Sequence, residues 1–432
     1  MSVAHKKIHT VIIGGGAAGM MAAISAKRHN KNQSVALLDR TFALGRKVLV
    51  CGAGRCNITN VNLDAGAVAH YYGADKEFIQ SVLEQFSYEQ IVTFFNDLGI
   101  ELYTERKTSI GKVFPVTDQA KTVNLLLEDE MRRLGVDIYL NTEVARVRKS
   151  DAGFVFDAYE VENNQRTDRH QVFTSECLVI SAGGRTYPAL GSNGSGYELA
   201  KMLGHRIIDP VPSALPLEAK SPLSHSANGT KMEIEARSFI NGKRVKSTVD
   251  DVMFTQYGLS GPAILNISRE ISIHLNRERK NRVEVELNFF PGKTASEVHN
   301  LLQSRWDKRP DQTVEMSMNG LLPPKIPPVL LQQAKIPLNK QAGSLTSQEV
   351  QHLMQLLTAY RVQVTATKGW NEAEFTAGGV DTSQVNPLTL ESRIVQNLYF
   401  CGEILNVDGD VGGYNLSWAW SSGFVAGKSG GN

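Results

Sequence analysis

The chain opens with a hydrophobic pattern that predicts a strand, a helix and a second strand. His9–Ile13 is a short run that ends in three β-branched residues, and a glycine cluster follows it directly. Met20–His29 is rich in residues that favour a helix, and Ser34–Leu38 is a second apolar run, long enough for a buried strand. This order of elements is typical of a parallel sheet whose strands are joined by a helix.

The glycines between the first strand and the helix have the spacing of a dinucleotide-binding turn. They read G-x-G-x-x-G at Gly14, Gly16 and Gly19, and Asp39 closes the second strand. The first glycine permits the tight turn, the second lets the backbone approach a pyrophosphate, and the third lets helix and strand pack closely. Phosphates bind at a helix N-terminus, and Asp39 can accept hydrogen bonds from a ribose diol. Both FAD and NAD suit this fingerprint, and its place near the N-terminus favours FAD.

Further glycine-rich blocks predict more contacts with the same cofactor. Residues 45–60 carry three basic side chains and follow the ribose acid, so they can return to the pyrophosphate and the flavin edge. Residues 176–184 read as a buried strand ending in small residues, and residues 191–202 read as a glycine loop that begins a helix. Ordinary surface loops and turns are the alternative interpretation of these blocks.

The C-terminal block predicts that both ends of the chain build one site. Leu398–Phe400 reads as a strand that ends at Gly402 and Glu403, and this acid is well placed to hold ribityl hydroxyls. Gly412–Gly413 then begins a helix rich in alanine and serine. The N-terminus of that helix, near flavin N1 and O2, would stabilise the anion that forms when the flavin is reduced.

The hydrophobic pattern changes in the middle of the chain. Met232–Ile240 and Val283–Phe290 alternate like half-buried strands, and an amphipathic helix is predicted at Gln348–Leu357 after a proline-rich stretch. We therefore expect an α/β protein with a Rossmann-like FAD-binding domain in two parts, residues 1–206 and 368–432. A β-rich insert with a small helical unit, residues 207–367, would cap the flavin site.

Composition narrows the class of protein. Of the 432 residues, 42% are hydrophobic and 21% are charged, the balance of a globular protein, which excludes disorder, collagen-like repeats and disulfide-dense scaffolds. No run reaches the roughly 18 apolar residues of a membrane span, so we expect a cytoplasmic protein without membrane contact. Residues 207–367 hold 19 basic and 15 acidic residues, a net charge of +4 that favours an anionic partner. Their densest basic cluster, residues 276–282, is equally explained as a solvated hairpin tip.

The four cysteines are too few for a disulfide framework and indicate a reducing compartment. Cys51 and Cys56 have the spacing of the redox pair in disulfide reductases. However, the downstream histidine–glutamate pair of those enzymes is missing near this C-terminus. A single C-x4-C pair is also poor support for zinc, so no metal site is predicted.

Taken together, the motifs resemble the BaiN-like (YhiN-like) family of FAD-dependent oxidoreductases. The resemblance covers nearly the whole chain and rests on these segments: Gly45–Lys47, Gly54–Asn60, Gly258–Pro262, Thr376–Val380 and Gly412–Asn415. It implies a two-part FAD domain with an insert, bound FAD and reduction by NAD(P)H. Family activities include reduction of conjugated C=C bonds, conversion of uridine to dihydrouridine in ribosomal RNA, and oxidation of aminoacetone. Two departures are Cys51, where many relatives carry a small residue, and Gln256, where many carry histidine.

We therefore expect hydride to pass from NAD(P)H to flavin N5 and then to an electron-poor double bond. The preferred substrate is the uracil ring of ribosomal RNA. The acid that protonates the neighbouring carbon is unassigned, with Cys56, Tyr187, Tyr257 and Tyr414 as candidates. The residues expected to hold the cofactor are Gly14, Gly16, Ala17, Ala18, Gly19, Asp39, Arg40, Arg46, Lys47, Gly54, Arg55, Cys56, Asn57, Thr59, Val144, Ala182, Gly183, Gly184, Gly402, Glu403, Gly412, Gly413, Tyr414, Asn415 and Leu416.

Three other functions fit the same motifs. A small-molecule ene-reductase or amine oxidase would have a closed apolar pocket and activity that salt does not change. A disulfide oxidoreductase would depend on Cys51 and Cys56. A non-catalytic flavin-binding interaction protein would bind FAD without turning over NAD(P)H.

Overall fold

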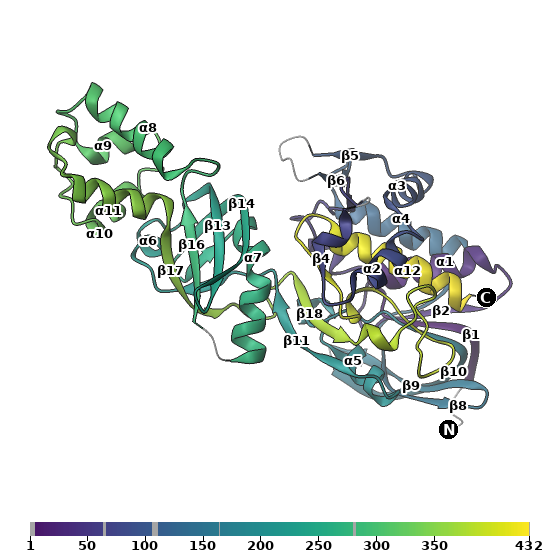
Figure 1. Ribbon diagram of the computed structural model, residues 1–432. Coiled ribbons are helices and arrows are strands. Elements are labelled where there is room, and N and C mark those ends of the chain that lie inside the picture. The colour runs from purple at the N-terminus through teal and green to yellow at the C-terminus, as the bar shows by residue number, and fades with distance from the viewer. Residues whose placement is uncertain (1–4, 64–65, 106–110, 164, 280–281, 432) are drawn as a thin grey trace. The chain divides into compact units, whose positions relative to one another are not determined.

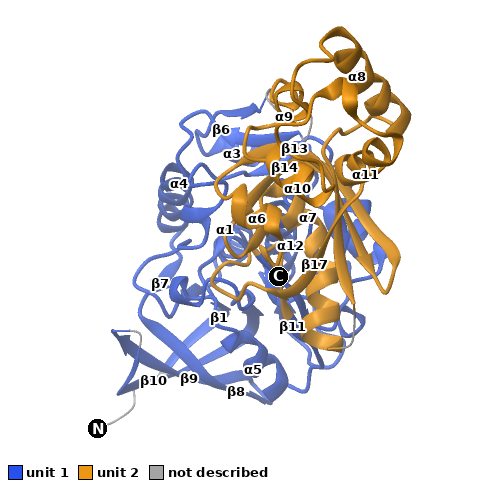
Figure 2. Cartoon of the chain, turned by 90° about the vertical axis from the view of Figure 1, so that its left-hand side faces the viewer, with its two compact units in different colours: residues 1–210, 375–432 blue, residues 211–374 orange. Residues whose placement is uncertain are grey.

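The computed structural model describes residues 5–63, 66–105, 111–163, 165–279 and 282–431. The chain forms two compact units (Figure 2): unit 1 comprises residues 1–210 and 375–432, and unit 2 comprises residues 211–374. The sequence predicted these boundaries at 206/207 and 367/368. β11 (Ile207–Ser213) pairs with β18 (Phe375–Val380), so the change of unit falls within this strand pair.

Unit 1 is built on a seven-stranded sheet. The strand order is β7 (Asp137–Tyr139), β2 (Val35–Leu38), β1 (His5–Ile13), β10 (Gln165–Ile180), β9 (Gly153–Glu162) and β8 (Thr142–Ser150), and β19 (Leu398–Phe400) also pairs with β10. The pairs β7–β2, β2–β1, β1–β10 and β10–β19 are parallel, whereas β9 and β8 pair antiparallel. β2 and β19 are wholly buried, as are the carboxyl ends of β1 (Thr10–Ile13) and β10 (Leu178–Ile180) that pair with them. This explains why these segments read as continuous apolar runs rather than as alternating ones.

Helices and short strands complete unit 1. The α-helices are α1 (Ala17–His29), α2 (Lys76–Leu83), α3 (Tyr88–Asp97), α4 (Ala120–Arg133), α5 (Ser195–Met202) and α12 (Tyr414–Gly430). The short strands are β3 (Thr59–Asn60), β4 (Tyr71–Tyr72), β5 (Leu102–Thr104), β6 (Lys112–Pro115) and β20 (Asp408–Gly409), and the 3-10 helices are η1 (Val48–Val50), η2 (Ala67–His70), η3 (Pro188–Leu190), η6 (Thr382–Gln384) and η7 (Gly402–Ile404).

α1 and α12 lie side by side and run parallel, as Figure 1 shows in purple and yellow. Glycines make their close approach possible. A Cβ at Gly423 would collide with the carbonyl oxygen of Ala18. One turn later, a Cβ at Gly427 would collide with that of Ala22. The first and last helices of the chain are therefore packed backbone against backbone.

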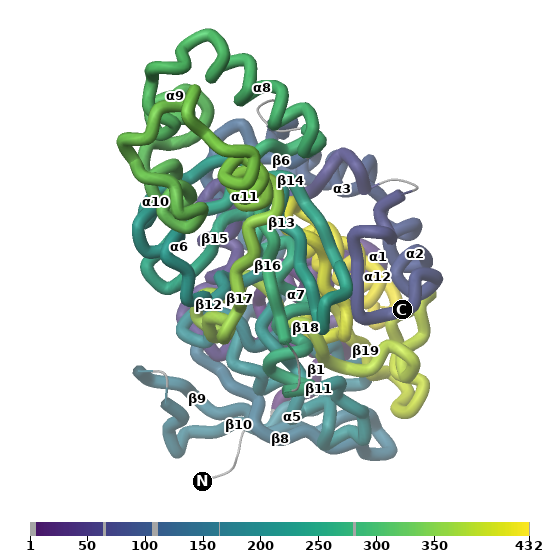
Figure 3. The backbone as a smooth tube through the Cα atoms, turned by 60° about the vertical axis from the view of Figure 1, so that its left-hand side comes forward, coloured from purple at the N-terminus to yellow at the C-terminus, as the bar shows by residue number. Residues whose placement is uncertain are grey.

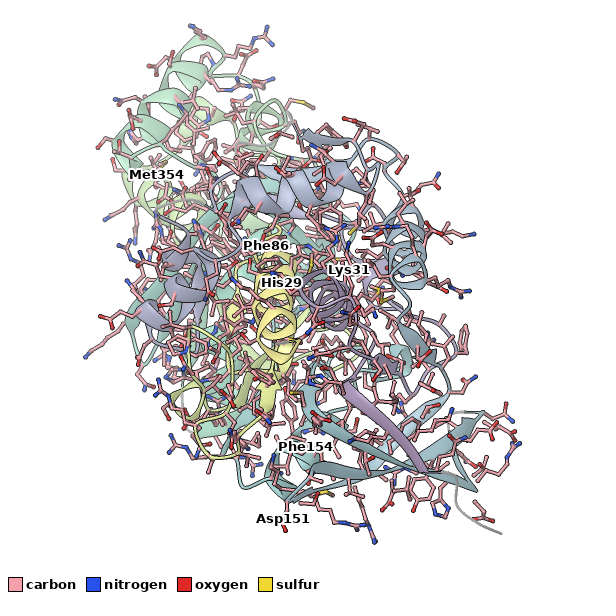
Figure 4. The ribbon with its side chains drawn as sticks, turned by 90° about the vertical axis from the view of Figure 1, so that its right-hand side faces the viewer. His29, Lys31, Phe86, Asp151, Phe154 and Met354 are labelled. Carbon is pink, nitrogen blue, oxygen red and sulfur yellow. The ribbon has the colours of Figure 1, made fainter. Side chains whose placement is uncertain are left out.

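Aromatic rings pack around the C-terminal end of α1, where it lies beside α12. Figure 4 labels His29, the last residue of α1, and Phe86, which lies beside α12. The Phe424 ring of α12 stacks on Phe86 at 4.4 Å between centroids and meets His29 edge-on at 5.5 Å. These rings therefore hold α1 and α12 together at the end opposite the sheet edge where the glycine motifs lie.

Unit 2 contains a closed barrel of six antiparallel strands. They follow the order β12 (Leu217–Ala219), β15 (Gly258–Ser260), β14 (Lys243–Thr255), β13 (Lys231–Ile240), β16 (Val283–Asn288) and β17 (Tyr360–Thr367). Alternate residues of β13, such as Ile234 and Ala236, are fully buried inside it. The predicted strands Met232–Ile240 and Val283–Phe290 are confirmed, with ends shifted by one or two residues.

The helices of unit 2 are α6 (Pro222–Ser226), α7 (Pro262–Ser272), the π-helical turn η4 (Ile273–Glu278), α8 (Ala295–Lys308), α9 (Val314–Met318), α10 (Pro327–Gln333), η5 (Ala342–Ser344) and α11 (Ser347–Thr358). α8 to α11 gather into the small helical unit that the sequence predicted (Figure 3). Capping boxes start α8 at Thr294 and α11 at Thr346. Within the described ranges, no helix has the length and apolar character that crossing a membrane requires.

Candidate active site

The motif residues follow the carboxyl ends of four neighbouring parallel strands. Gly14 follows β1, Asp39 follows β2, Ser181 follows β10 and Cys401 follows β19. Because these strands are parallel, the four chain segments leave the sheet at one edge. The chain passes from β1 to β2 on one side and later returns to β10 on the other. Ligands of open α/β sheets bind at such a switch point.

The three fingerprint positions differ in what a side chain there would meet. Gly14 adopts a φ of +104°, and a Cβ there would lie 2.6 Å from the carbonyl oxygen of Ser181. A Cβ at Gly19 would overlap the carbonyl oxygen of Gly14. Gly16 has an ordinary φ of −77°, and no described protein atom lies within 4 Å of the position that its Cβ would take. Protein packing therefore explains Gly14 and Gly19, whereas Gly16 borders open space.

That space lies at the start of α1. Gly16 is the N-cap residue of α1 and offers no capping side chain. The first N–H groups of a helix lack partners within the helix and carry its positive dipole end, so they attract anions. Ala17 and Ala18 form the first turn there and present only methyl groups. The turn thus has the features of a phosphate-binding cradle.

Asp39 shapes the loop beside this turn. Its Oδ2 accepts a hydrogen bond of 2.6 Å from the Gly15 N–H, and its Oδ1 accepts bonds of 2.7 Å from the N–H and hydroxyl of Thr41. Arg40 lies next to it, 3.8 Å from Glu143, and its buried Nε has no hydrogen-bond partner within the described residues. Val144 follows that glutamate and is buried in β8. Asp39 therefore holds the turn and the start of the following loop through both of its carboxylate oxygens.

Residues 57–60 hold the start of α12. The Asn60 side-chain amide donates a 2.8 Å hydrogen bond to the Gly412 carbonyl, and the hydroxyls of Thr59 and Ser417 lie 2.8 Å apart. A Cβ at Gly413, where φ is +103°, would lie 2.5 Å from the Thr59 carbonyl oxygen. The second and fourth sequence blocks are therefore joined at the N-terminus of α12.

This N-terminus projects beyond that of α1. Gly423 packs beside Ala18, and Tyr414 lies nine residues before Gly423. At 1.5 Å per residue, the start of α12 extends roughly 13 Å past the first turn of α1. The two helices are parallel, so the site has two positive helix ends staggered along one direction. An elongated dinucleotide has anionic or electron-rich groups at two such positions.

Lys47 and Glu403 tie the remaining blocks together. The Lys47 ammonium lies 2.7 Å from Glu403 Oε2 and 2.5 Å from the Thr186 hydroxyl. Glu403 Oε1 accepts a 2.9 Å hydrogen bond from the Thr376 N–H. A Cβ at Gly184 would come within 2.7 Å of the same Glu403 oxygen. All four predicted blocks thus supply residues to one connected region of unit 1.

The other predicted residues differ in their hydrogen bonds, backbone geometry and burial. The Asn415 side chain bonds to the backbone of Gly409 at 2.9 and 2.8 Å, and Asn57 accepts from the Val113 N–H at 3.2 Å. Gly54 has a φ of +84° and Gly183 a φ of +71°, whereas Ala182 and Leu416 are half-buried.

Two of the predicted cationic residues contact aromatic rings. Arg46 lies over the exposed ring of Phe42, 4.7 Å from its centroid. Arg55 lies 4.0 Å from the centroid of Phe114 and forms a 3.0 Å ion pair with Glu105. The charge of Arg55 is therefore compensated within the protein.

The four candidate proton donors differ in accessibility. Cys56 is fully buried, and burial raises the pKa of its thiol well above the ordinary value. Burial, together with the charge of Asp410, raises the pKa of Tyr414 to about 12. Tyr187 is half-buried with a left-handed backbone, and Tyr257 belongs to unit 2, where Lys368 lies over its ring. A buried group with a raised pKa is a weak acid near neutrality, which disfavours Cys56 and Tyr414 as donors.

The burial of the cysteines can be tested directly by chemical labelling. We expect iodoacetamide to leave Cys56, Cys177 and Cys401 unmodified near neutral pH in the native protein. All three are buried, and burial raises each thiol pKa, that of Cys177 to about 11. Peptide mass spectrometry would locate the label, and denatured protein is the control. Labelling of native Cys56 would contradict its burial and revive the disulfide alternative.

Sequence reasoning missed a second group of polar side chains at this site. His70 Nδ1 lies 3.0 Å from Asp410 Oδ2, and the Tyr72 hydroxyl donates to Asp410 Oδ1 at 3.1 Å. The His70 ring stacks on Tyr414 with centroids 4.4 Å apart. No motif marks residues 70–72. The only sequence signal was an acid two residues before the glycine pair.

Comparisons with known proteins agree with this architecture. The family described as "HI0933-like protein Rossmann domain" matches residues 8–429. The 3-dehydro-bile acid delta(4,6)-reductase of Clostridium scindens is 36% identical over 418 residues, covering 97% of this chain and 98% of that protein. The ribosomal RNA dihydrouridine synthase of Escherichia coli K12 is 31% identical over 417 residues, covering 96% of each.

A solved structure extends the likeness in fold. The 3-ketosteroid delta1-dehydrogenase of Sterolibacterium denitrificans superposes with a TM-score of 0.50 at 12% identity, covering 99% of both chains. The resemblance of the motifs and the α/β fold class are thereby confirmed. The chain belongs to the HI0933-like Rossmann family, the group of BaiN-like FAD-dependent oxidoreductases that its glycine blocks resemble.

Proposed function

We propose that this enzyme holds one FAD along the carboxyl edge of the unit 1 sheet and uses NAD(P)H to reduce a C=C bond conjugated to a carbonyl group. The observation that carries the proposal is the pair of parallel helix N-termini, with open space at Gly16 in front of the first of them. The flavin supplies a ring that accepts and releases hydride. The chain contributes orientation and electrostatics.

Each part of the site suits one part of FAD. Asp39 would receive the adenosine ribose, with Arg40 and Val144 towards the adenine. The turn at Gly16 would hold the pyrophosphate against the first N–H groups of α1. The Lys47–Glu403 pair would face the ribityl chain. The start of α12 at Gly412–Tyr414 would face the pyrimidine edge of the flavin, where a positive helix end favours negative charge.

The substrate class follows from chemistry that two relatives share. One is named for reduction at the delta(4,6) positions of a bile acid and the other for making dihydrouridine in ribosomal RNA. Reducing a uridine ring to dihydrouridine saturates a C=C bond next to a carbonyl, and a conjugated 3-keto steroid presents the same arrangement. Hydride addition to such a bond needs an electron-withdrawing carbonyl, so an enone-type C=C bond is the proposed reacting group.

Charge on unit 2 favours RNA as the substrate. The β13–β14 and η4–β16 connections are joined because the Asn241 N–H donates to the Arg282 carbonyl at 2.9 Å. Lys243, Arg244 and Arg279 are exposed at these connections and have no acidic partner within the described residues. Such side chains suit phosphate groups of RNA, whose binding they would make dependent on salt. The 36% identity to the bile acid reductase favours a small molecule instead.

The experiment offers both substrates to the reduced protein without oxygen. The flavin is bleached with NADPH or NADH, and then ribosomal RNA lacking the modification or a small conjugated ketone is added. RNA-dependent reoxidation with dihydrouridine found by mass spectrometry supports RNA. This RNA-dependent reoxidation should be slower when Lys243 and Arg244 are both replaced by glutamate. It should be unchanged in the control variant Lys308→Glu on α8. Reoxidation by the ketone alone would replace RNA with a small molecule.

Asp39→Ala is expected to weaken FAD binding by about tenfold, equivalent to about 1.4 kcal/mol. The substitution removes the proposed ribose acceptor and also three hydrogen bonds, those from the backbone N–H groups of Gly15 and Thr41 and from the Thr41 hydroxyl. Asp39→Asn keeps one acceptor oxygen and should fall between wild type and Asp39→Ala. Equilibrium dialysis of apo-protein against FAD measures the effect. Unchanged affinity in both variants would show that the ribose is held elsewhere.

A further inference from the structure

The loop that leads into α12 is fixed by three consecutive residues of η2 and β4. β20 pairs antiparallel with β4, and the Asp410 N–H donates to the His70 carbonyl at 2.9 Å. The Tyr71 hydroxyl donates to the Tyr414 carbonyl at 2.7 Å. The Tyr72 hydroxyl bonds to the Asp410 carboxylate. Backbone and side-chain bonds together therefore set where the His70 imidazole lies.

The His70 imidazole is held in one orientation with one nitrogen available. Nδ1 faces the Asp410 carboxylate, and the ring stacks on Tyr414, the first residue of α12. Nε2 has no hydrogen-bond partner within the described residues, and 41% of the side chain is exposed. A carboxylate on one ring nitrogen fixes the tautomer and leaves the other nitrogen to exchange a proton. Among the described residues, Tyr72 bonds to the Asp410 carboxylate and Tyr414 stacks on the His70 ring, so both titratable groups contact this pair.

This arrangement meets requirements that Cys56 and Tyr414 do not meet together. A general acid should be accessible, oriented by a third group and able to release a proton near neutral pH. Cys56 is sealed from solvent, and Tyr414 is buried beneath the imidazole. Histidine is the side chain whose ordinary titration lies near neutrality. His70 also lies at the helix end that is expected to face the flavin.

We propose that His70, oriented by Asp410, is the proton donor of the reduction. This inference rests on the proposed function and names the acid of the same site. The carbon β to the carbonyl receives hydride derived from NAD(P)H, and the π electrons of the C=C bond take the Nε2 proton of the His70 imidazolium at the α carbon, leaving the neutral ring with its Nδ1–H on Asp410. The N–H electron pair stays on the imidazole, which regains a proton from solvent through its exposed edge. Each turnover consumes one NAD(P)H and one proton.

The test separates the two half-reactions in the FAD-loaded protein. We expect His70→Ala to be bleached by NAD(P)H at the wild-type rate. Its reoxidation by the conjugated substrate should be slower by about a hundredfold, as for loss of a general acid. Reoxidation by ferricyanide, which protonates no carbon, should be unchanged. Added imidazole should restore part of the lost rate because the site is open to solvent. Asp410→Asn should show a smaller loss, and the exposed His352→Ala serves as the control.

A separate readout excludes a purely structural role. The FAD dissociation constant of apo-protein, measured by quenching of flavin fluorescence, should differ less than about twofold between wild type and His70→Ala, which is under 0.5 kcal/mol. Weakened FAD binding with both half-reactions slowed alike would overturn the proposal and make His70 a support for the turn. Normal substrate reoxidation in His70→Ala would overturn it as well. If wild-type protein is reoxidised by no conjugated substrate, the proposed function fails, and the inference fails with it.

Discussion

Gly16→Val is expected to give a folded protein that retains almost no FAD. Valine accepts the φ of −77° at this position, and its Cβ would meet no described protein atom within 4 Å. Its side chain would instead fill the space in front of the α1 N-terminus, where the pyrophosphate is proposed to bind. We expect FAD affinity to fall at least about a hundredfold, or about 2.7 kcal/mol. Flavin absorbance per chain after purification measures the loss, and thermal melting of apo-protein checks the fold.

Gly369→Val provides the matched control for this substitution. Gly369 is exposed in unit 2 and, like Gly16, has no positive φ that valine would strain. The control should retain FAD and melt like wild type. If Gly16→Val is purified with full flavin content, the fingerprint does not hold the pyrophosphate.

Gly423→Val is expected to lose both stability and FAD. A Cβ at Gly423 would collide with the carbonyl oxygen of Ala18, and a backbone atom in a helix has little freedom to move aside. Separating α1 from α12 should cost about 3 kcal/mol, as for other overpacked cores. Because both helix N-termini belong to the proposed site, FAD binding should weaken with the packing. Urea unfolding of the apo-protein measures the stability change.

Lys428→Val is the control on the same helix. Lys428 is exposed on α12, so its replacement changes helix sequence without changing helix packing. It should keep stability within about 0.5 kcal/mol of wild type. A stable, flavin-loaded Gly423→Val would contradict the close contact between the first and last helices of the chain.

The parts of the site that could be predicted from sequence are those fixed by local chemistry. In a strand–turn–helix unit, each fingerprint position needs glycine for a distinct physical reason. The roles of Gly14, Gly16 and Gly19 could therefore be predicted from their spacing alone. The strand ends at Asp39 and Glu403 were found because buried parallel strands read as short apolar runs bounded by glycines and acids. These signals lie within a few residues of one another along the chain.

The parts that could not be predicted depend on partners distant in the chain. His70 and Asp410 are 340 residues apart, and neither belongs to a recognisable pattern. Arg55 looked like a phosphate ligand, yet its ion pair is with Glu105, which spacing does not reveal. Gly258 and Gly261 belong to a segment that carries the family resemblance, and their spacing does not reveal their neighbours. In the fold, a Cβ at either position would collide with neighbouring backbone in the barrel, Leu217 or Asp251 respectively.

The most direct test of this account is the absorption spectrum of the purified wild-type protein, recorded without oxygen before and after addition of NADPH or NADH. We expect an oxidised flavin spectrum, one FAD released per chain on denaturation, and bleaching by at least one of the two nucleotides. A protein that carries no flavin and does not take up added FAD, or whose bound flavin neither nucleotide reduces, would contradict the assignment of the two helix ends to an FAD-dependent reductase.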